Sequence, residues 1–205
     1  PNSNVIEGTA NSRFKTNYVA TGFLVHDNPV VQTDVTLKTS QVLGLSGNIW
    51  SNYDTKTGTL SEVDFGVGYF KPFSEYLAGN VALTHFDFDF GRLPFNDAQN
   101  LGVGLSTQNL PVTFGAKVDQ IFGDGSSHGR SYALTLGKTF DLTKSFGLES
   151  MLGPSGLQFS VGSDVTFNDH YFNPNTGWAY ASANVGLSAD LGNGWGVNAG
   201  FYQQI

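Results

Sequence analysis

Apolar and polar residues alternate with a period of two along most of this chain. In the clearest run, Leu157, Phe159 and Val161 fall on one face, and Gln158 and Ser160 fall on the other. Successive side chains of a β-strand point to opposite faces of its sheet, so each such run predicts a strand with one apolar and one polar face. Turn-forming residues separate about eleven such runs, at 14–26, 31–38, 43–50, 62–69, 82–90, 100–106, 112–119, 131–137, 157–168, 179–189 and 195–204. The first run is ambiguous, because both of its faces carry apolar residues.

The composition of the two faces distinguishes a membrane barrel from a soluble sandwich. A soluble two-sheet core would place large aliphatic residues inside and Lys and Glu outside. Here the polar face is rich in Gly, Ser, Thr and Asn, and the apolar face ends in aromatic residues. Lys71 and Lys138 fall on the apolar face at strand ends, from which they can reach lipid headgroups. This pattern favours a transmembrane antiparallel β-barrel with a lipid-facing apolar surface and a polar lumen.

The strand count bears on how such a barrel closes. Bacterial outer-membrane barrels have an even number of strands, whereas the alternation predicts eleven. A further strand is therefore expected, either at 146–152 or beyond Ile205. We predict an all-β, up-and-down barrel of 12 strands, with 10 as the alternative. In this interpretation residues 1–205 form a single domain, and residues 1–11 are a polar N-terminal segment.

The connections predict which end of the barrel is which. Those near Ser40, Asn109, Thr143 and Gly192 are tight, as periplasmic turns are. Those at 54–59, 91–97, 123–130 and 173–177 are longer and richer in Gly, Pro and Asn, as extracellular loops are.

The polar face supplies the residues expected to line the lumen. Small residues such as Gly66, Gly102 and Gly104 indicate open space there, while Tyr180 and Tyr202 would fill part of it. The predicted lumen residues with larger or charged side chains are Asp34, Lys38, Trp50, Glu62, Asp64, His85, Asp87, Asp89, Lys117, Asp119 and Asp164. Acidic residues outnumber lysines in this set, so a conducting lumen should favour cations.

Composition excludes several other functions. The chain has 13% charged residues, 26 glycines, no cysteine and a formal net charge of −7. That charge argues against nucleic acid as a partner, and the absence of cysteine excludes disulfides and thiolate chemistry. The longest mostly apolar stretch, 18–25, is far shorter than the roughly 18 residues that a membrane helix needs.

Few residues point to catalysis. His85, Asp87 and Asp89 share one predicted face and could form an acid and base pair of the kind that an outer-membrane hydrolase uses. The chain has no Gly-x-Ser-x-Gly elbow, and Ser163 falls on the lipid face. We therefore expect no catalytic residues and no cofactor, and the protein is predicted not to be an enzyme.

A weaker pattern concerns the histidines at the predicted extracellular rim. His26, His85 and His170 each have an acidic neighbour, and for His85 it is Asp87. Imidazole and carboxylate together could bind a divalent metal or change the charge of the mouth near neutral pH. The alternative is that they are polar rim residues without a specific role.

One segment carries a family resemblance. The run Thr16 to Gly22, followed by Asp27 to Gln32, resembles the start of a family of widespread, uncharacterised, porin-like outer-membrane proteins of proteobacteria. Family members often have Phe and Arg before the glycine, where this chain has Ala20 and Thr21. The resemblance, over residues 16–32, implies a small barrel in the outer membrane of Gram-negative bacteria and supplies no catalytic residues.

These observations lead to one expected function and its alternatives. A narrow porin-like diffusion channel is expected, with membrane lipid and lipopolysaccharide as partners and small ions or solutes as cargo. A non-conducting structural or adhesive barrel and an outer-membrane hydrolase are the alternatives. The sequence does not set the oligomeric state.

Overall fold

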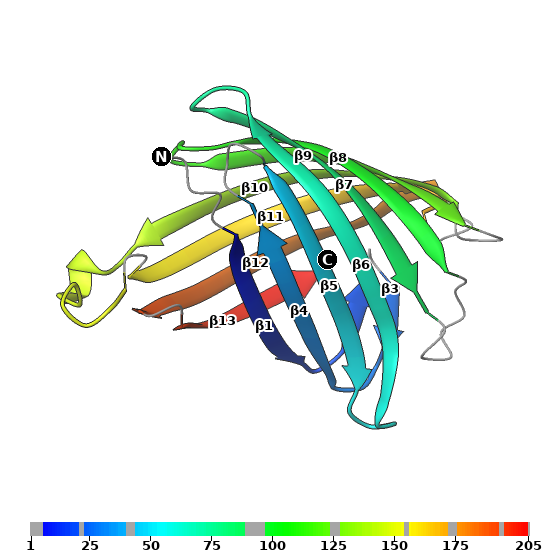
Figure 1. The fold of residues 1–205 in the computed structure, drawn as a ribbon, viewed down its shortest axis with the longest axis horizontal. Coiled ribbons are helices and arrows are strands. Elements are labelled where there is room, and N and C mark those ends of the chain that lie inside the picture. Colours follow the sequence, from blue (N-terminus) through cyan, green and yellow to red (C-terminus); the bar gives the residue numbers. More distant parts are fainter. Residues whose placement is uncertain are drawn as a thin grey trace.

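The computed structural model describes residues 6–20, 23–39, 44–88, 97–123, 128–153, 156–171, 176–192 and 195–204. These residues form an antiparallel, up-and-down sheet of eleven strands in which sheet order follows chain order (Figure 1). Its strands are β1 (Glu7–Lys15), β4 (Val30–Lys38), β5 (Leu45–Asp54), β6 (Thr59–Pro72), β7 (Leu77–Asp87), β8 (Ala98–Thr107), β9 (Thr113–Gly123), β10 (Gly129–Asp141), β11 (Leu157–Asp169), β12 (Thr176–Gly192) and β13 (Trp195–Gln204). Two short strands, β2 (Tyr18–Ala20) and β3 (Phe23–His26), pair separately. The described residues include one 3₁₀ helix (Lys144–Phe146) and no helix with the length and hydropathy to cross a bilayer.

The sheet is strongly curved, so that one of its faces surrounds an interior. In Figure 1 strands β10 to β13 cross the direction of β1, β4, β5 and β6. Strands β5 to β13 all contribute side chains to a single cavity, which defines the inner face of the sheet. Strands β1 and β13 are the two edges, and they run in the same direction because the strand count is odd.

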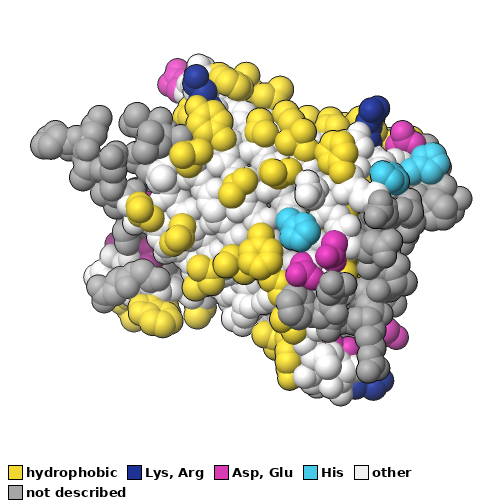
Figure 2. Space-filling model, turned by 45° about the vertical axis from the view of Figure 1, so that its right-hand side comes forward, with side chains coloured by type: hydrophobic (Ala, Val, Ile, Leu, Met, Phe, Trp, Pro, Cys, Tyr) yellow, Lys and Arg dark blue, Asp and Glu magenta, His cyan; other side chains and the backbone are white. Residues whose placement is uncertain are grey.

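The two faces of the sheet are inverted relative to a water-soluble protein. Among the described residues, thirteen buried residues are polar or charged and seven are apolar. Large apolar side chains are instead exposed on the outer face, with Leu134 at 66% and Val67 at 61%. Seen from outside, hydrophobic side chains spread over the middle of the surface, and Lys and Arg lie at its margins (Figure 2).

Aromatic residues occupy the ends of the outer face on several strands. On β9 the outer residues run from Phe114 through Val118 to Phe122, and on β11 Phe159 and Phe167 bracket aliphatic residues in the same way. On β13 they run from Trp195 to Phe201. The outer face therefore has an aliphatic middle between aromatic ends.

Glycines on the inner face make room for polar side chains rather than for open space. Gly66 lies directly across from Asn48, and a Cβ added at Gly66 would overlap the Asn48 Oδ1 atom. The same cross-strand pairing of a glycine with a polar residue recurs at Gly68 with Ser46, Gly102 with Asp119, Gly104 with Asn80, Gly115 with Thr135, Gly162 with Asn184 and Gly186 with Ser160. The prediction that these glycines mark empty lumen is therefore corrected, because a neighbouring polar side chain covers each of them.

Strands β4 to β13 lie where the alternation predicts them, and the first predicted strand is wrong. The wall strand is Glu7–Lys15, within a segment mostly predicted as a polar tail, and it pairs with β4 from Glu7↔Lys38 to Lys15↔Val30. The described residues 16–20 and 23–29 leave the wall, and among them β2 pairs with β3. Residues 146–152 form turns and the end of the 3₁₀ helix instead of a strand. The described sheet thus has eleven strands, neither 12 nor 10.

Two of the described connections differ in length from the prediction, whereas the connections predicted near Ser40 and Gly192 and at 91–97, 123–130 and 173–177 lie partly or wholly outside the described residues. The link at 55–58 is a four-residue turn, because the Asp54 carboxylate accepts hydrogen bonds from the backbone N–H groups of Lys56 and Thr57. The link between β10 and β11, residues 142–156, is long and contains the 3₁₀ helix, so the connection near Thr143 is not a tight turn.

Candidate functional site

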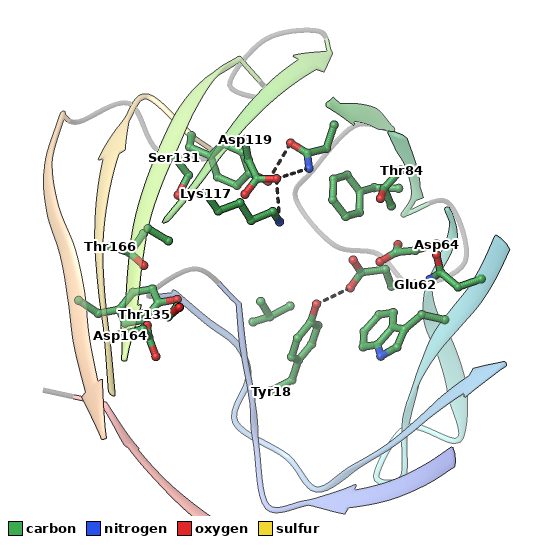
Figure 3. A pocket seen from close by; sticks show the side chains of 18 of the residues that line it. Tyr18, Glu62, Asp64, Thr84, Lys117, Asp119, Ser131, Thr135, Asp164 and Thr166 are labelled. Carbon is green, nitrogen blue, oxygen red and sulfur yellow. Dashed lines mark hydrogen bonds and ion pairs between the residues drawn. The ribbon is translucent and has the colours of Figure 1, made fainter. Parts of the chain in front are cut away.

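The interior of the curved sheet holds a cavity of about 710 Å³ (Figure 3). Its walls carry aromatic, amide, hydroxyl and carboxylate side chains from β5 to β13, together with Tyr18 and Val25 of the hairpin. Three groups of polar side chains point into it from different sides in Figure 3.

The first group joins the hairpin to the wall. The Tyr18 hydroxyl donates a 2.9 Å hydrogen bond to the Glu62 carboxylate, and the Tyr18 ring lies 5.7 Å from the Trp50 ring. Glu62 and Asp64 are two residues apart on the inner face of β6, and both line the cavity. Asp64 pairs across the sheet with Trp50, so the two carboxyl groups lie beside an aromatic surface.

Tyr18 reaches this position because the chain turns inward between β1 and β4. Lys15 and Val30 pair at the end of these strands, and the described residues between them, 16–20 and 23–29, are not part of the eleven-stranded sheet. Burial, reinforced by the nearby charge of Glu62, raises the pKa of Tyr18 well above its usual value. The phenol therefore stays protonated at neutral pH and acts as a donor.

The second group lies on β8 and β9. Asp119 forms an ion pair with Lys117 at 2.8 Å and accepts a 2.8 Å hydrogen bond from the Asn100 amide. The Tyr171 hydroxyl, from the segment after β11, donates to the Asn100 carbonyl at 3.3 Å and so spans the interior. Burial raises the pKa of Tyr171, and this keeps its phenol protonated. The Tyr171 ring packs with Ala98 and Ile121 at this end of the sheet.

The third group lies on β11 and β12, where the Ser182 hydroxyl donates to Asp164. A fifth acidic residue, Asp34 on β4, does not line the cavity, and it contacts Arg13 at 3.4 Å and the Asn11 amide at 2.9 Å. Asp164 therefore accepts a hydrogen bond from Ser182, and Asp34 lies beside the positive charge of Arg13.

The structure brings most of the predicted lumen residues together. Those that line the cavity are Trp50, Glu62, Asp64, Lys117, Asp119 and Asp164, as well as Tyr180 and Tyr202. Asp34 and Lys38 occupy positions of β4 that belong to the inner face of the sheet, but they do not line the cavity. Asp89 lies outside the described residues.

His85 and Asp87 lie on the outer face, and this corrects their predicted place. Phe86 and Phe88, predicted to face lipid, line the cavity together with Thr84, and their two rings stack at 6.0 Å. The prediction took the phenylalanines of this run as outward, whereas this end of the interior is large enough to hold their rings. The proposed acid and base pair of His85 and Asp87 is therefore not in the lumen.

Sequence reasoning missed Tyr18 and Tyr171 as contributors to the cavity, and it put Asn100 on the polar face without singling it out. Asn100 faces inward because the even-numbered residues of β8 do so. Nothing in the sequence indicates that Tyr18 and Tyr171 point into the interior from connections. Both are aromatic residues with a hydroxyl, and this suits a buried position beside polar groups.

The histidines whose side chains the structure describes do not gather at one site. His170 contacts its neighbour Asp169 at 2.8 Å, His85 is on the outer face, and the side chain of His26 lies outside the described residues. In the described part of the chain, no three His, Cys, Asp or Glu side chains are placed to hold a metal ion. The cavity is thus a polar, acidic and aromatic site.

Comparison with known proteins identifies no relative, since no family model, curated protein or solved structure matches the chain.

Proposed function

We propose that this chain is an outer-membrane β-barrel of Gram-negative bacteria that forms a narrow, cation-preferring diffusion channel. One observation carries the proposal, the inverted distribution of side chains. An outer face of exposed Leu, Val and Phe has a large unfavourable free energy in water and a favourable one in lipid. The polar inner face suits water and ions.

The dimensions of the outer face support a bilayer environment. Phe114 and Phe122 are eight positions apart, which is about 27 Å along a strand. In a barrel whose strands tilt by about 40°, this corresponds to roughly 20 Å along the barrel axis. Lys138 lies over the Phe140 ring at 4.8 Å, near the end of β10, where its ammonium group can reach headgroups. Aromatic rings at both ends of the strands suit the two interfaces of a membrane.

A membrane barrel also requires that the edges of the sheet be paired. Unpaired backbone N–H and C=O groups are too costly in hydrocarbon. We therefore propose that β1 and β13 meet along a parallel seam, or that a further strand lies between them.

The charges of the interior support a preference for cations. Among the described residues, four carboxyl groups line the cavity, those of Glu62, Asp64, Asp119 and Asp164, whereas Lys117 is the only lysine or arginine that does so. A low-dielectric wall around these groups strengthens their field in the lumen.

One observation favours a non-conducting barrel as a second candidate. Tyr18 and Tyr171 cross the interior, and polar side chains cover the inner glycines, so the passage is partly filled. A sheet of this size lies between side-chain-filled barrels of about 8 strands and open channels of 16 or more.

The two candidates differ in a planar bilayer. Protein folded in detergent should show β-type circular dichroism and migrate differently on gels when heated and unheated, and its insertion should give small discrete conductance steps that heat-denatured protein does not give. Folded, heat-modifiable protein without conductance would favour the structural barrel. A monodisperse monomer without detergent would contradict a membrane location altogether.

A further inference from the structure

We infer that Glu62, Asp64, Tyr18 and Trp50 form a binding site for a small organic monocation with N–H donors, such as a primary ammonium ion. We call this group of four residues the acid pair site. It does not require the protein to conduct, because it depends only on the folded interior.

The acid pair differs from the other acidic residues of the inner face. Asp119 has Lys117, Asp34 has Arg13, and Asp164 has Ser182. Within the described part of the chain, neither Glu62 nor Asp64 forms an ion pair. The Oδ1 atom of Asp64 is buried and has no hydrogen-bond partner.

The burial of this pair is nearly complete. Glu62 is 3% exposed and Asp64 is 9% exposed, and both point into the cavity (Figure 3). A buried acceptor without a donor is costly, and a buried charge without a partner is more so. A ligand that donates an N–H group to Asp64 Oδ1 would remove both costs at once.

The unpartnered acceptor indicates a ligand with an N–H donor. The Tyr18 hydroxyl already donates to Glu62, whereas the buried Oδ1 atom of Asp64 has no donor. A single ammonium group supplies both the N–H donor that this oxygen lacks and a positive charge beside the two carboxyl groups.

The surroundings favour an organic cation over a metal ion. The rings of Trp50 and Tyr18 lie 5.7 Å apart beside the pair, and Phe86 and Phe88 also line the cavity. Aromatic faces attract ammonium groups and pack against their alkyl chains. A metal would need additional ligands, and the described residues offer no cluster of three.

The test is isothermal titration of the folded, heat-modifiable protein with propylammonium chloride. Tetramethylammonium, which has charge but no N–H donor, and propanol, which has a similar chain but no charge, are the comparison compounds. We expect saturable binding of propylammonium, at least tenfold weaker binding of tetramethylammonium, and none of propanol. No binding of propylammonium, or equal binding of propanol, would overturn the site.

Three variants test whether propylammonium binds at the acid pair site rather than elsewhere in the cavity. Asp64→Asn keeps the size of the side chain but removes the charge, and it should weaken propylammonium binding at least tenfold. Asp164→Asn changes a partnered acid in the same cavity and should alter the affinity less than twofold. Trp50→Leu keeps both carboxyl groups and should weaken binding severalfold, so it carries the test if Asp64→Asn does not fold. Equal losses in Asp64→Asn and Asp164→Asn would show only a general attraction of cations and would contradict the site.

The result of the binding test can be distinguished from the result of the conductance test. A barrel that binds propylammonium without conducting would overturn the channel and support the site. A barrel that conducts without binding propylammonium would support the channel and overturn the acid pair site.

Discussion

The Tyr18 hydroxyl lies 2.9 Å from the Glu62 carboxylate and joins residues 44 positions apart in the chain. This contact fixes the inward hairpin to wall strand β6. Because the donor and acceptor are both buried, the bond is made in surroundings where water cannot replace it.

Replacement of Tyr18 by Phe should therefore destabilise the fold by about 1.5–3 kcal/mol, the range for a hydrogen bond to a charged group. Tyr132→Phe, on the outer face of β10, is the matched control and should change stability by less than about 0.5 kcal/mol. Urea unfolding in lipid vesicles measures both. Equal stability of the two variants would show that the hairpin is not held by Glu62.

Inner and outer glycines should respond differently to a methyl group. Gly66→Ala places a Cβ against Asn48 and should cost about 1–3 kcal/mol. Gly47→Ala, on the outer face of β5, meets nothing closer than 3.9 Å and should be neutral. The additional change Asn48→Ala should restore most of the stability lost in Gly66→Ala. A loss at Gly66 that Asn48→Ala does not rescue would mean that another contact causes it.

The sequence alone predicts the wall from β4 to β13, because the period of two marks each strand, and it assigns the inner and outer faces correctly except on β7. It cannot predict β1, since its residues are exposed on both faces and carry no apolar alternation. It also mistakes residues 18–26 for wall, because a hairpin inside the sheet has apolar residues on both faces.

The candidate site is only half predictable for a related reason. Glu62, Asp64 and Trp50 follow from strand parity, whereas Tyr18 depends on the path of a connection. The pairing of glycines with polar residues depends on register, which individual strands do not encode. Phe86 and Phe88 show that an apolar residue need not face outward where the interior is wide.

Adjacent residues of β10 test the two faces directly. Leu134→Arg puts a charge at the middle of the outer face and should cost about 2–4 kcal/mol in a bilayer. Thr135→Arg points into the cavity, where Asp164 is its cross-strand neighbour, and should cost less than about 1 kcal/mol. The comparison is made by unfolding in phospholipid vesicles. If Leu134→Arg is as stable as Thr135→Arg, the outer face does not lie in lipid.

Cysteine pairs test whether the sheet closes between its edges. The chain has no native cysteine, so an introduced pair reports only on itself. Asn11→Cys on β1 would be combined in turn with Cys at Asn198, Gly200 or Tyr202 on β13, all of inner-face parity. A short bis-maleimide should link one of these pairs within a single chain and change its gel migration. Links only between chains, or none, would contradict a direct β1–β13 seam and favour a further strand between them.

The selectivity of the channel should depend on Lys117 in a direction fixed by its ion pair. Lys117 lies 2.8 Å from Asp119 and offsets the charge of that carboxylate. Lys117→Ala therefore leaves Asp119 unbalanced and should raise the cation preference, measured as a more strongly cation-selective reversal potential across a KCl gradient. Glu62→Gln together with Asp164→Asn should lower that preference, because two of the acidic side chains lining the cavity become neutral. Lys138→Ala removes a lysine from the outer face and should leave the reversal potential unchanged. An anion-selective protein, or a cation preference that falls in Lys117→Ala, would show that ions do not pass along the acidic inner face.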